Sequence, residues 1–411
     1  ELHEQILARM DLSTEPTDEK LQEIIHEVLE EHSREEFIPL REKAVLGKEL
    51  FNALRKLDIL QELLEDETIT EIMINGVENI FIEQNGNIFI SEKRFLSKGK
   101  LEDIVQQMVA ECNRVVNESL PIVDTRLKDG SRVNVVLPPV ALNGPIVTIR
   151  KFPKERITMH QLLSYEAISK EAAEFLIRLV RARYNIFISG GTSSGKTTFL
   201  NVLADYIPKT ERVITIEDSA ELQIHGIENL VRMEVRQADG DGVSNVTLRD
   251  LIRTSLRMRP DRIIVGEVRG EEALDMIQSM NTGHDGSLST GHANSPQDML
   301  SRLETMALFA SDIPIQAIRK QIASSIDIIV QLERLRDRSR RVTAIAEVLD
   351  CTEDAYILNP IFEFHEQDNL VMESSSYGDI PERVVGQLER TGYHLMHRRK
   401  LHAAALESAE I

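Results

Sequence analysis

The chain has 411 residues, a formal net charge of −20 at pH 7, 42% apolar residues and 4% aromatic residues. This length predicts at least two domains. No apolar run approaches the roughly 18–20 residues of a membrane span. The acidic charge argues against nucleic acid as a partner, because phosphate-binding surfaces are normally basic. The two cysteines, Cys112 and Cys351, are far apart in sequence, which excludes a four-cysteine zinc site and suits a reducing cytosol.

The first 150 residues contain two kinds of pattern. Residues 1–66 carry apolar side chains at helical spacing, as at Leu21, Ile24 and Val28, and we predict a helical N-terminal segment there. Residues 67–150 alternate β-branched and polar residues, with Asn-Gly pairs of the kind that close hairpins, and we predict an α+β N-terminal domain. Its predicted elements include strands from residue 68 to 90, a helix over roughly 100–112, and strands over 132–137 and 146–150.

Beyond a predicted linker at 151–157, the pattern changes to helices alternating with apolar strands. This alternation is typical of a parallel sheet, so we predict an α/β domain over 158–369 and a helical tail over 370–411. The predicted strands of the α/β domain include 186–189, 213–216, 263–265 and 287–290.

A phosphate-binding loop follows the first of these strands. Residues 190–197 match the pattern G-x-x-x-x-G-K-[ST], and a helical pattern begins at Thr198. Backbone N–H groups of such a loop point at phosphate oxygens, Lys196 reaches the β- and γ-phosphates, and Thr197 places its hydroxyl on Mg²⁺. We therefore predict a nucleoside triphosphate site with Mg²⁺. Its predicted binding residues are Gly190, Gly191, Thr192, Ser193, Ser194, Gly195, Lys196, Thr197 and Thr198.

A second element of the predicted site is an acid at the end of a strand. The apolar strand 262–265 is followed by Gly266 and Glu267, the shape of a Walker B element. An acid at this edge of the sheet can hold Mg²⁺ or a water of its shell. The alternative is a strand that happens to end beside a glutamate.

Three further acids, Glu217, Asp218 and Glu221, follow the strand at 213–216. One of them can accept a proton from the attacking water, which requires a carboxylate within hydrogen-bond reach. The alternative is a helix start at which acids complement the helix dipole.

Two histidines, His284 and His292, lie in a glycine-rich stretch near residue 290. A zinc site would need further His or Cys ligands nearby, so a sensor of the γ-phosphate is the better interpretation. A purely structural turn is the alternative.

The order of these motifs resembles the secretion-superfamily ATPases that power type II and type IV secretion and type IV pili. The resemblance covers roughly residues 60–350, and the chain lacks the four-cysteine zinc module of some branches. Within the superfamily four segments are most similar to the tight-adherence pilus assembly ATPases, with the conjugation-type ATPases next. The four segments are Glu71–Gly76, Asp129–Asn134, Thr148–Phe152 and Gly291–Ser295.

This resemblance implies a RecA-like P-loop ATPase domain with a parallel-rich sheet, preceded by the α+β domain, and it implies ATP as the nucleotide. It makes Glu267 the Walker B acid, which contacts Mg²⁺ through water, and Glu221 the catalytic glutamate, with Glu217 nearby. The remaining residues to which it gives a role are His284 and His292 of the histidine box, and Arg126, Arg132 and Arg150, which would reach the triphosphate from the N-terminal domain.

The resemblance further implies a cytoplasmic homo-hexamer that hydrolyses ATP to power pilus assembly or protein secretion. Its expected place is peripheral at the inner membrane, against a platform protein of that machine. A conjugation-type type IV secretion ATPase is the first alternative, and a nucleic-acid translocase on the same core is a second, disfavoured by the acidic charge. A small-molecule kinase would leave the large N-terminal part unexplained.

Overall fold

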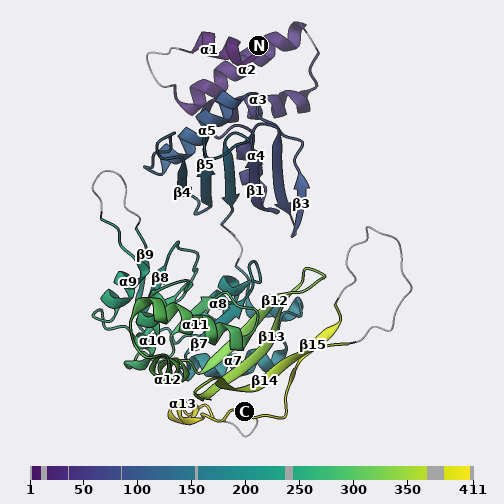
Figure 1. Cartoon of the computed structure of the whole chain (residues 1–411). Coiled ribbons are helices and arrows are strands. Elements are labelled where there is room, and N and C mark those ends of the chain that lie inside the picture. Colours follow the sequence, from purple (N-terminus) through teal and green to yellow (C-terminus); the bar gives the residue numbers. More distant parts are fainter. Residues whose placement is uncertain are drawn as a thin grey trace. The chain divides into compact units, whose positions relative to one another are not determined.

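The computed structural model describes residues 2–10, 16–35, 37–84, 86–152, 156–236, 244–367 and 384–407. The chain forms two compact units, Glu1–Glu155 and Arg156–Ile411 (Figure 1). Residues 153–155 of the predicted linker, and residues 370–383 and 408–411 of the predicted tail, lie outside the described residues. No helix within the described ranges is long and apolar enough to cross a membrane.

Unit 1 begins with helices, as the apolar spacing predicts. Ile6, Leu21, Ile25 and Val28 are buried together between the first three helices. Pro39 immediately precedes the third helix, where its missing N–H costs nothing. The helices are α1 (Leu2–Arg9), α2 (Asp18–Glu35), α3 (Leu40–Arg55) and α4 (Ile59–Glu65).

A six-stranded antiparallel sheet forms the rest of unit 1. Its order is β3-β2-β1-β6-β5-β4, and its buried face packs on α4 and on α5 (Lys98–Glu111), which begins at the side-chain cap of Ser97. Strand β4 was not predicted from the sequence. The strands are β1 (Ile69–Asn75), β2 (Asn79–Gln84), β3 (Asn87–Ile90), β4 (Ile122–Arg126), β5 (Arg132–Val136) and β6 (Ile146–Arg150).

Unit 2 is built on a nine-stranded sheet of order β15-β14-β13-β12-β7-β11-β10-β8-β9. The six strands from β12 to β9 are mutually parallel, and β13, β14 and β15 are added antiparallel at one side. The strands are β7 (Ile186–Gly190), β8 (Val213–Glu217), β9 (Leu230–Glu234), β10 (Arg262–Val265), β11 (Leu288–Gly291), β12 (Ile328–Arg334), β13 (Arg340–Cys351), β14 (Tyr356–Glu366) and β15 (Gly386–Arg390).

Helices cover both faces of this sheet, which is why its central strands are apolar on both sides. Ile186 and Ile188 of β7 pack with the first three helices of the unit, whereas Phe187 packs with the next four. The helices are α6 (Met159–Ser164), α7 (Lys170–Arg181) and α8 (Lys196–Ala204), then α9 (Leu248–Ser255), α10 (Glu272–Asn281), α11 (Pro296–Ala310) and α12 (Ile315–Ser325), and finally α13 (Arg399–Ala403).

The predicted helical tail is wrong for one segment. Residues 386–390 form β15, which pairs antiparallel with β14, and the short helix α13 follows it. Leu388 and Leu401 are both buried in the core on the α7 face. The described part of the tail is therefore an integral part of unit 2.

Candidate nucleotide site

The predicted phosphate loop lies at the carboxyl edge of the parallel strands, where α/β proteins bind ligands. Strand β7 ends at Gly190 and α8 begins at Lys196, so the nine predicted binding residues occupy the loop and the first turn of α8. A Cβ on Gly190 would collide with the carbonyl oxygen of Leu332. Ser193 and Gly195 have φ values of +58° and +94°, which is the left-handed conformation that such a loop requires.

The side chain of Lys196 lies inside the loop and is 7% exposed. Its Nζ donates to the carbonyl oxygens of Gly190 (3.1 Å) and Gly191 (2.8 Å) and lies 3.3 Å from Nδ1 of His292. A buried ammonium group is favourable only where polar groups replace its hydration. The loop therefore holds a desolvated positive charge where a phosphate would lie.

Glu267 and His292 lie side by side next to this lysine. Oε1 of Glu267 is 2.6 Å from Nε2 of His292, yet this buried oxygen makes no hydrogen bond of acceptable geometry. Burial lowers the pKa of His292, outweighing the opposing charge of Glu267, so the imidazole is neutral near pH 7. The distances are consistent with a proton on Nε2 and with Nδ1 accepting from Lys196, an assignment made from geometry.

Arg269, which was not predicted from the sequence, completes the group. Its Nη2 donates to Oε2 of Glu267 at 2.8 Å, and its Nη1 is 3.8 Å from Asp218. Burial would raise the pKa of Glu267, but the hydrogen bond and charge of Arg269, with the charge of Lys196, lower it overall. The signal for Arg269 in the sequence was its position two residues after the Walker B acid.

Glu217 has a positioning role that the sequence did not reveal. Its side chain is 3% exposed, and its Oε1 accepts the backbone N–H groups of Glu221 (2.7 Å) and Leu222 (2.8 Å). The carboxylate thus fixes the chain that carries the partly buried Glu221. Glu221 also contributes to raising the pKa of Arg269, so the two groups lie in one electrostatic cluster.

We expect the stability of the protein to depend on pH through Glu217. Burial raises the pKa of Glu217 from 4.5 to about 7, against the opposing effect of its two backbone donors. The folded state therefore binds this proton more tightly than the unfolded state. The stability that the proton contributes is complete below pH 4.5 and is lost as the pH rises through 7.

The variant Glu217→Gln keeps an oxygen for the two N–H groups but cannot ionise. Between pH 5 and 8 the wild type should lose about 2–3 kcal/mol of stability relative to this variant. The measurement is urea unfolding of both proteins without nucleotide at each pH. The same pH dependence of stability in the two proteins would contradict the raised pKa of Glu217.

The structure does not bring His284 to the phosphate loop of its own chain. His292 follows the carboxyl end of β11, whereas His284 precedes the amino end of the same strand. Because β11 is parallel to β7, His284 lies at the sheet edge opposite to the phosphate loop. Its Nδ1 there is 3.2 Å from the carbonyl oxygen of Ser279.

The three predicted arginines lie in unit 1 and form one row across its sheet. Arg132 pairs with Arg126 on one side and with Arg150 on the other, and Arg150 pairs with Glu71. Directly paired residues share a face of a sheet. The opposite face of these strands is buried, so the row occupies the polar face.

The residues of unit 2 fit a nucleotide with Mg²⁺. The loop encloses a buried lysine, and the carboxylate of Glu267 beside it is a hard ligand of the type that Mg²⁺ prefers. Thr197 lies in the first turn of α8, where a Walker A hydroxyl is expected. Within the described ranges no three His, Cys, Asp or Glu side chains are grouped as metal ligands.

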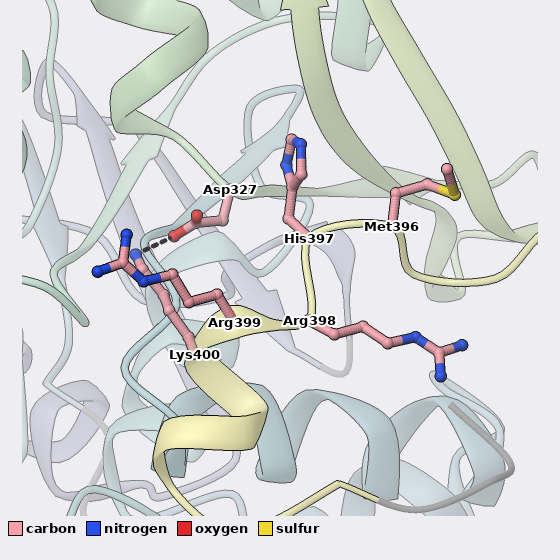
Figure 2. A pocket seen from close by; sticks show the side chains of 6 residues that line it. All are labelled: Asp327, Met396, His397, Arg398, Arg399 and Lys400. Carbon is pink, nitrogen blue, oxygen red and sulfur yellow. Dashed lines mark hydrogen bonds and ion pairs between the residues drawn. The ribbon is translucent and has the colours of Figure 1, made fainter.

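A separate pocket of about 420 Å³ lies at the opposite edge of the sheet (Figure 2). Lys400 reaches into it and pairs with Asp327 (2.6 Å) and Asp285 (2.7 Å). Asp327 directly precedes β12, and Asp285 lies shortly before β11. Burial raises the pKa of Asp327 against the effect of Lys400. Figure 2 shows Arg398 turned away from Asp327. The pocket lies between the start of α13 and the amino ends of the strands, at the edge of the sheet opposite to the phosphate loop.

Fold and site together define a class of protein. A phosphate loop, a buried lysine and a strand-terminal carboxylate at the carboxyl edge of a parallel sheet are the parts of a P-loop nucleotide-binding protein. The chain belongs to the family of type II/IV secretion system proteins, whose family model matches residues 53–372. This is a family of ATPases, so membership implies ATP binding and hydrolysis.

Relatives with 30–32% identity support the same membership. A putative conjugal transfer protein of Mycobacterium tuberculosis is 32% identical over 70% of this chain and 83% of its own. The conjugal transfer protein TrbB of Rhizobium radiobacter is 32% identical over 71% and 87%. The type IV secretion system protein VirB11 of Bartonella quintana is 30% identical over 69% and 90%.

Solved structures support the fold. The ATPase DotB of Yersinia pseudotuberculosis matches 72% of this chain and 79% of its own with a TM-score of 0.52 at 19% identity. The pilus retraction motor PilT with bound ADP matches 74% and 81% with a TM-score of 0.50 at 19% identity. The predicted fold class is thereby confirmed.

The predicted superfamily is also confirmed, but its predicted branch is not. The named relatives above are conjugal transfer and type IV secretion proteins, which agrees better with the conjugation-type alternative than with tight-adherence pilus assembly.

Proposed function

We propose that this protein is an ATP-hydrolysing motor of a conjugation-type type IV secretion machine. The observation that carries the proposal is the contact of Lys196, His292 and Glu267, which joins the phosphate loop to the Walker B acid across the three parallel strands β7, β11 and β10. The assignment to a conjugation-type secretion machine is supported by relatives of at least 30% identity, which are named as conjugal transfer or type IV secretion proteins. Pilus assembly is the second candidate, favoured by the four sequence segments that resemble tight-adherence ATPases.

Each residue then has a chemical task. The loop N–H groups and Lys196 bind the β- and γ-phosphates, and Glu221, held by Glu217, accepts the proton of the attacking water. Mg²⁺, held by Thr197 and by Glu267 through water, would neutralise charge that develops on the phosphates. His292 lies between the lysine and the acid, where a neutral imidazole can sense the γ-phosphate.

We further propose a homo-hexamer that works in the cytoplasm, peripheral at the inner membrane, against a platform protein. A ring suits the chemistry, because the transition state of phosphoryl transfer needs positive charge from beyond the phosphate loop. The arginine row of unit 1 is a source of such charge. Analytical ultracentrifugation with ATP and Mg²⁺ should show an assembly of six 46.6-kDa chains.

Glu221→Gln should bind ATP normally and lose about 100-fold or more in turnover, because the amide fills the same space but cannot accept a proton. The measurements are fluorescent-nucleotide titration and phosphate release with Mg²⁺. Glu228→Gln, an exposed position further along the same loop, is the matched control and should retain turnover. Normal hydrolysis by Glu221→Gln would exclude Glu221 as the base.

A further inference from the structure

An arginine-rich hairpin lies beside the phosphate loop. The segment from Arg334 to Arg341 joins β12 to β13 and contains five arginines in eight residues. Its turn is closed by hydrogen bonds between Leu335 and Ser339 (2.8 Å) and from Arg338 to Leu335 (2.8 Å). Strand β12 pairs directly with β7, and Leu332 is the partner of Gly190, so the hairpin extends from the strand next to the loop.

One arginine of this hairpin contacts the loop itself. Nε of Arg340 donates to the backbone carbonyl of Ser193 at 2.8 Å. Its Cδ lies 3.4 Å from where a Cβ on Gly195 would be, so its stem runs along the loop. Ser193, at φ +58°, is a non-glycine residue in the left-handed conformation, which is strained. The hydrogen bond from Arg340 therefore stabilises the peptide group on which the loop conformation depends.

The hairpin is a firm support for this contact. Asp337 accepts hydrogen bonds from the backbone of Ser339 (3.0 Å) and of Val384 (2.8 Å). Arg341 is 4% exposed and donates to the carbonyl oxygens of Val384 and Gly386, both at 3.0 Å. Because the turn, through Asp337, and β13, through Arg341, are both bonded to residues 384–386 at the start of β15 and just before it, Arg340 is held in place on the side of the loop.

We propose that Arg340 is a positioning residue of the nucleotide site, which holds the phosphate loop in its binding conformation from the β12–β13 hairpin. The inference rests on the proposed nucleotide-binding function and adds a residue to which no motif assigns a role. Arg340 touches the loop backbone, while the reacting groups are held by Lys196, Glu221 and Glu267. Its loss should therefore weaken nucleotide binding more than it slows the chemical step.

The test compares Arg340→Ala and Arg340→Lys with Arg336→Ala. Arg336 belongs to the same hairpin but pairs with Glu366, so it is a matched control. We expect Arg340→Ala to raise the Kd for fluorescent ADP and the KM for ATP about 10-fold, the loss of one charge-assisted hydrogen bond, with kcat within about twofold. Arg340→Lys should be intermediate, since a lysine keeps a donor but not its direction.

Arg336→Ala should bind nucleotide as the wild type does, and all three variants should keep the melting temperature of the nucleotide-free protein. Wild-type affinity in Arg340→Ala would overturn the inference, as would an equal loss of affinity in Arg336→Ala. If Lys196→Ala also bound like the wild type, the nucleotide site itself would be wrong, and that result is distinct from a failure of Arg340 alone.

Discussion

Lys196→Ala is expected to abolish ATP hydrolysis and to weaken nucleotide binding by roughly 100-fold or more. The reason is the position of this ammonium group, which is buried within the loop and bonded to the carbonyls of Gly190 and Gly191. A phosphate entering the loop would meet it already desolvated, so little hydration energy is lost on binding. Alanine leaves the N–H groups of the loop but removes this charge.

The measurements for Lys196→Ala are fluorescent-nucleotide titration and phosphate release over time. Lys170→Ala, at an exposed position at the start of α7, is the matched control and should behave as the wild type. The charge of Lys196 also lowers the pKa of the neighbouring His292, so the pKa of His292 should rise in this variant. Normal turnover in Lys196→Ala would remove the loop from the mechanism.

Arg132→Ala and Arg150→Ala should each lower turnover by roughly 1,000-fold, on the scale of arginine fingers. The structural reason is the row that these residues form with Arg126 on the polar face of the unit 1 sheet. Like charges directly opposite each other in a sheet are destabilising. We expect such a row of like charges where the arginines bind an anion and do not stabilise the fold.

Stability separates this hypothesis from a structural role. If the row binds the triphosphate in the course of the reaction, removing Arg132 should leave the melting temperature unchanged within about 4 °C, because a surface charge contributes at most about 1 kcal/mol. The control is Arg94→Ala, an exposed arginine of unit 1 that follows β3. Near-normal hydrolysis in both Arg132→Ala and Arg150→Ala would end the hypothesis that unit 1 supplies charge to the site.

Much of the nucleotide site could be predicted because its parts are local. The loop at 190–197 needs a strand before it and a helix after it, and both are visible as apolar patterns within about ten residues. Glu267 was found in the same way, from the apolar strand that precedes it. The branch of the superfamily was predicted less well, because four short segments are a small sample of the chain.

Elements that depend on distant partners were missed. Strands β4 and β15 lie at the edges of their sheets, and each is formed by pairing with one neighbour. Arg269 and Arg340 are ordinary surface arginines in the sequence. Their roles come from Glu267 and from the carbonyl of Ser193, and Ser193 is 147 residues from Arg340.

The two histidines, His284 and His292, illustrate the difference between what local sequence predicts and what strand pairing sets. The order of the residues predicts that both histidines flank a short apolar strand, and it also predicts the phosphate loop, the Walker B acid and the alternation that gives a parallel sheet. The contact of His292 with Lys196 and Glu267, and the position of His284 at the opposite edge of the sheet, follow instead from how the strands pair. Neighbouring residues set the hydrophobic period that makes a segment a helix or a strand. Which strands pair, and in which direction, depends on burying apolar faces from the whole unit.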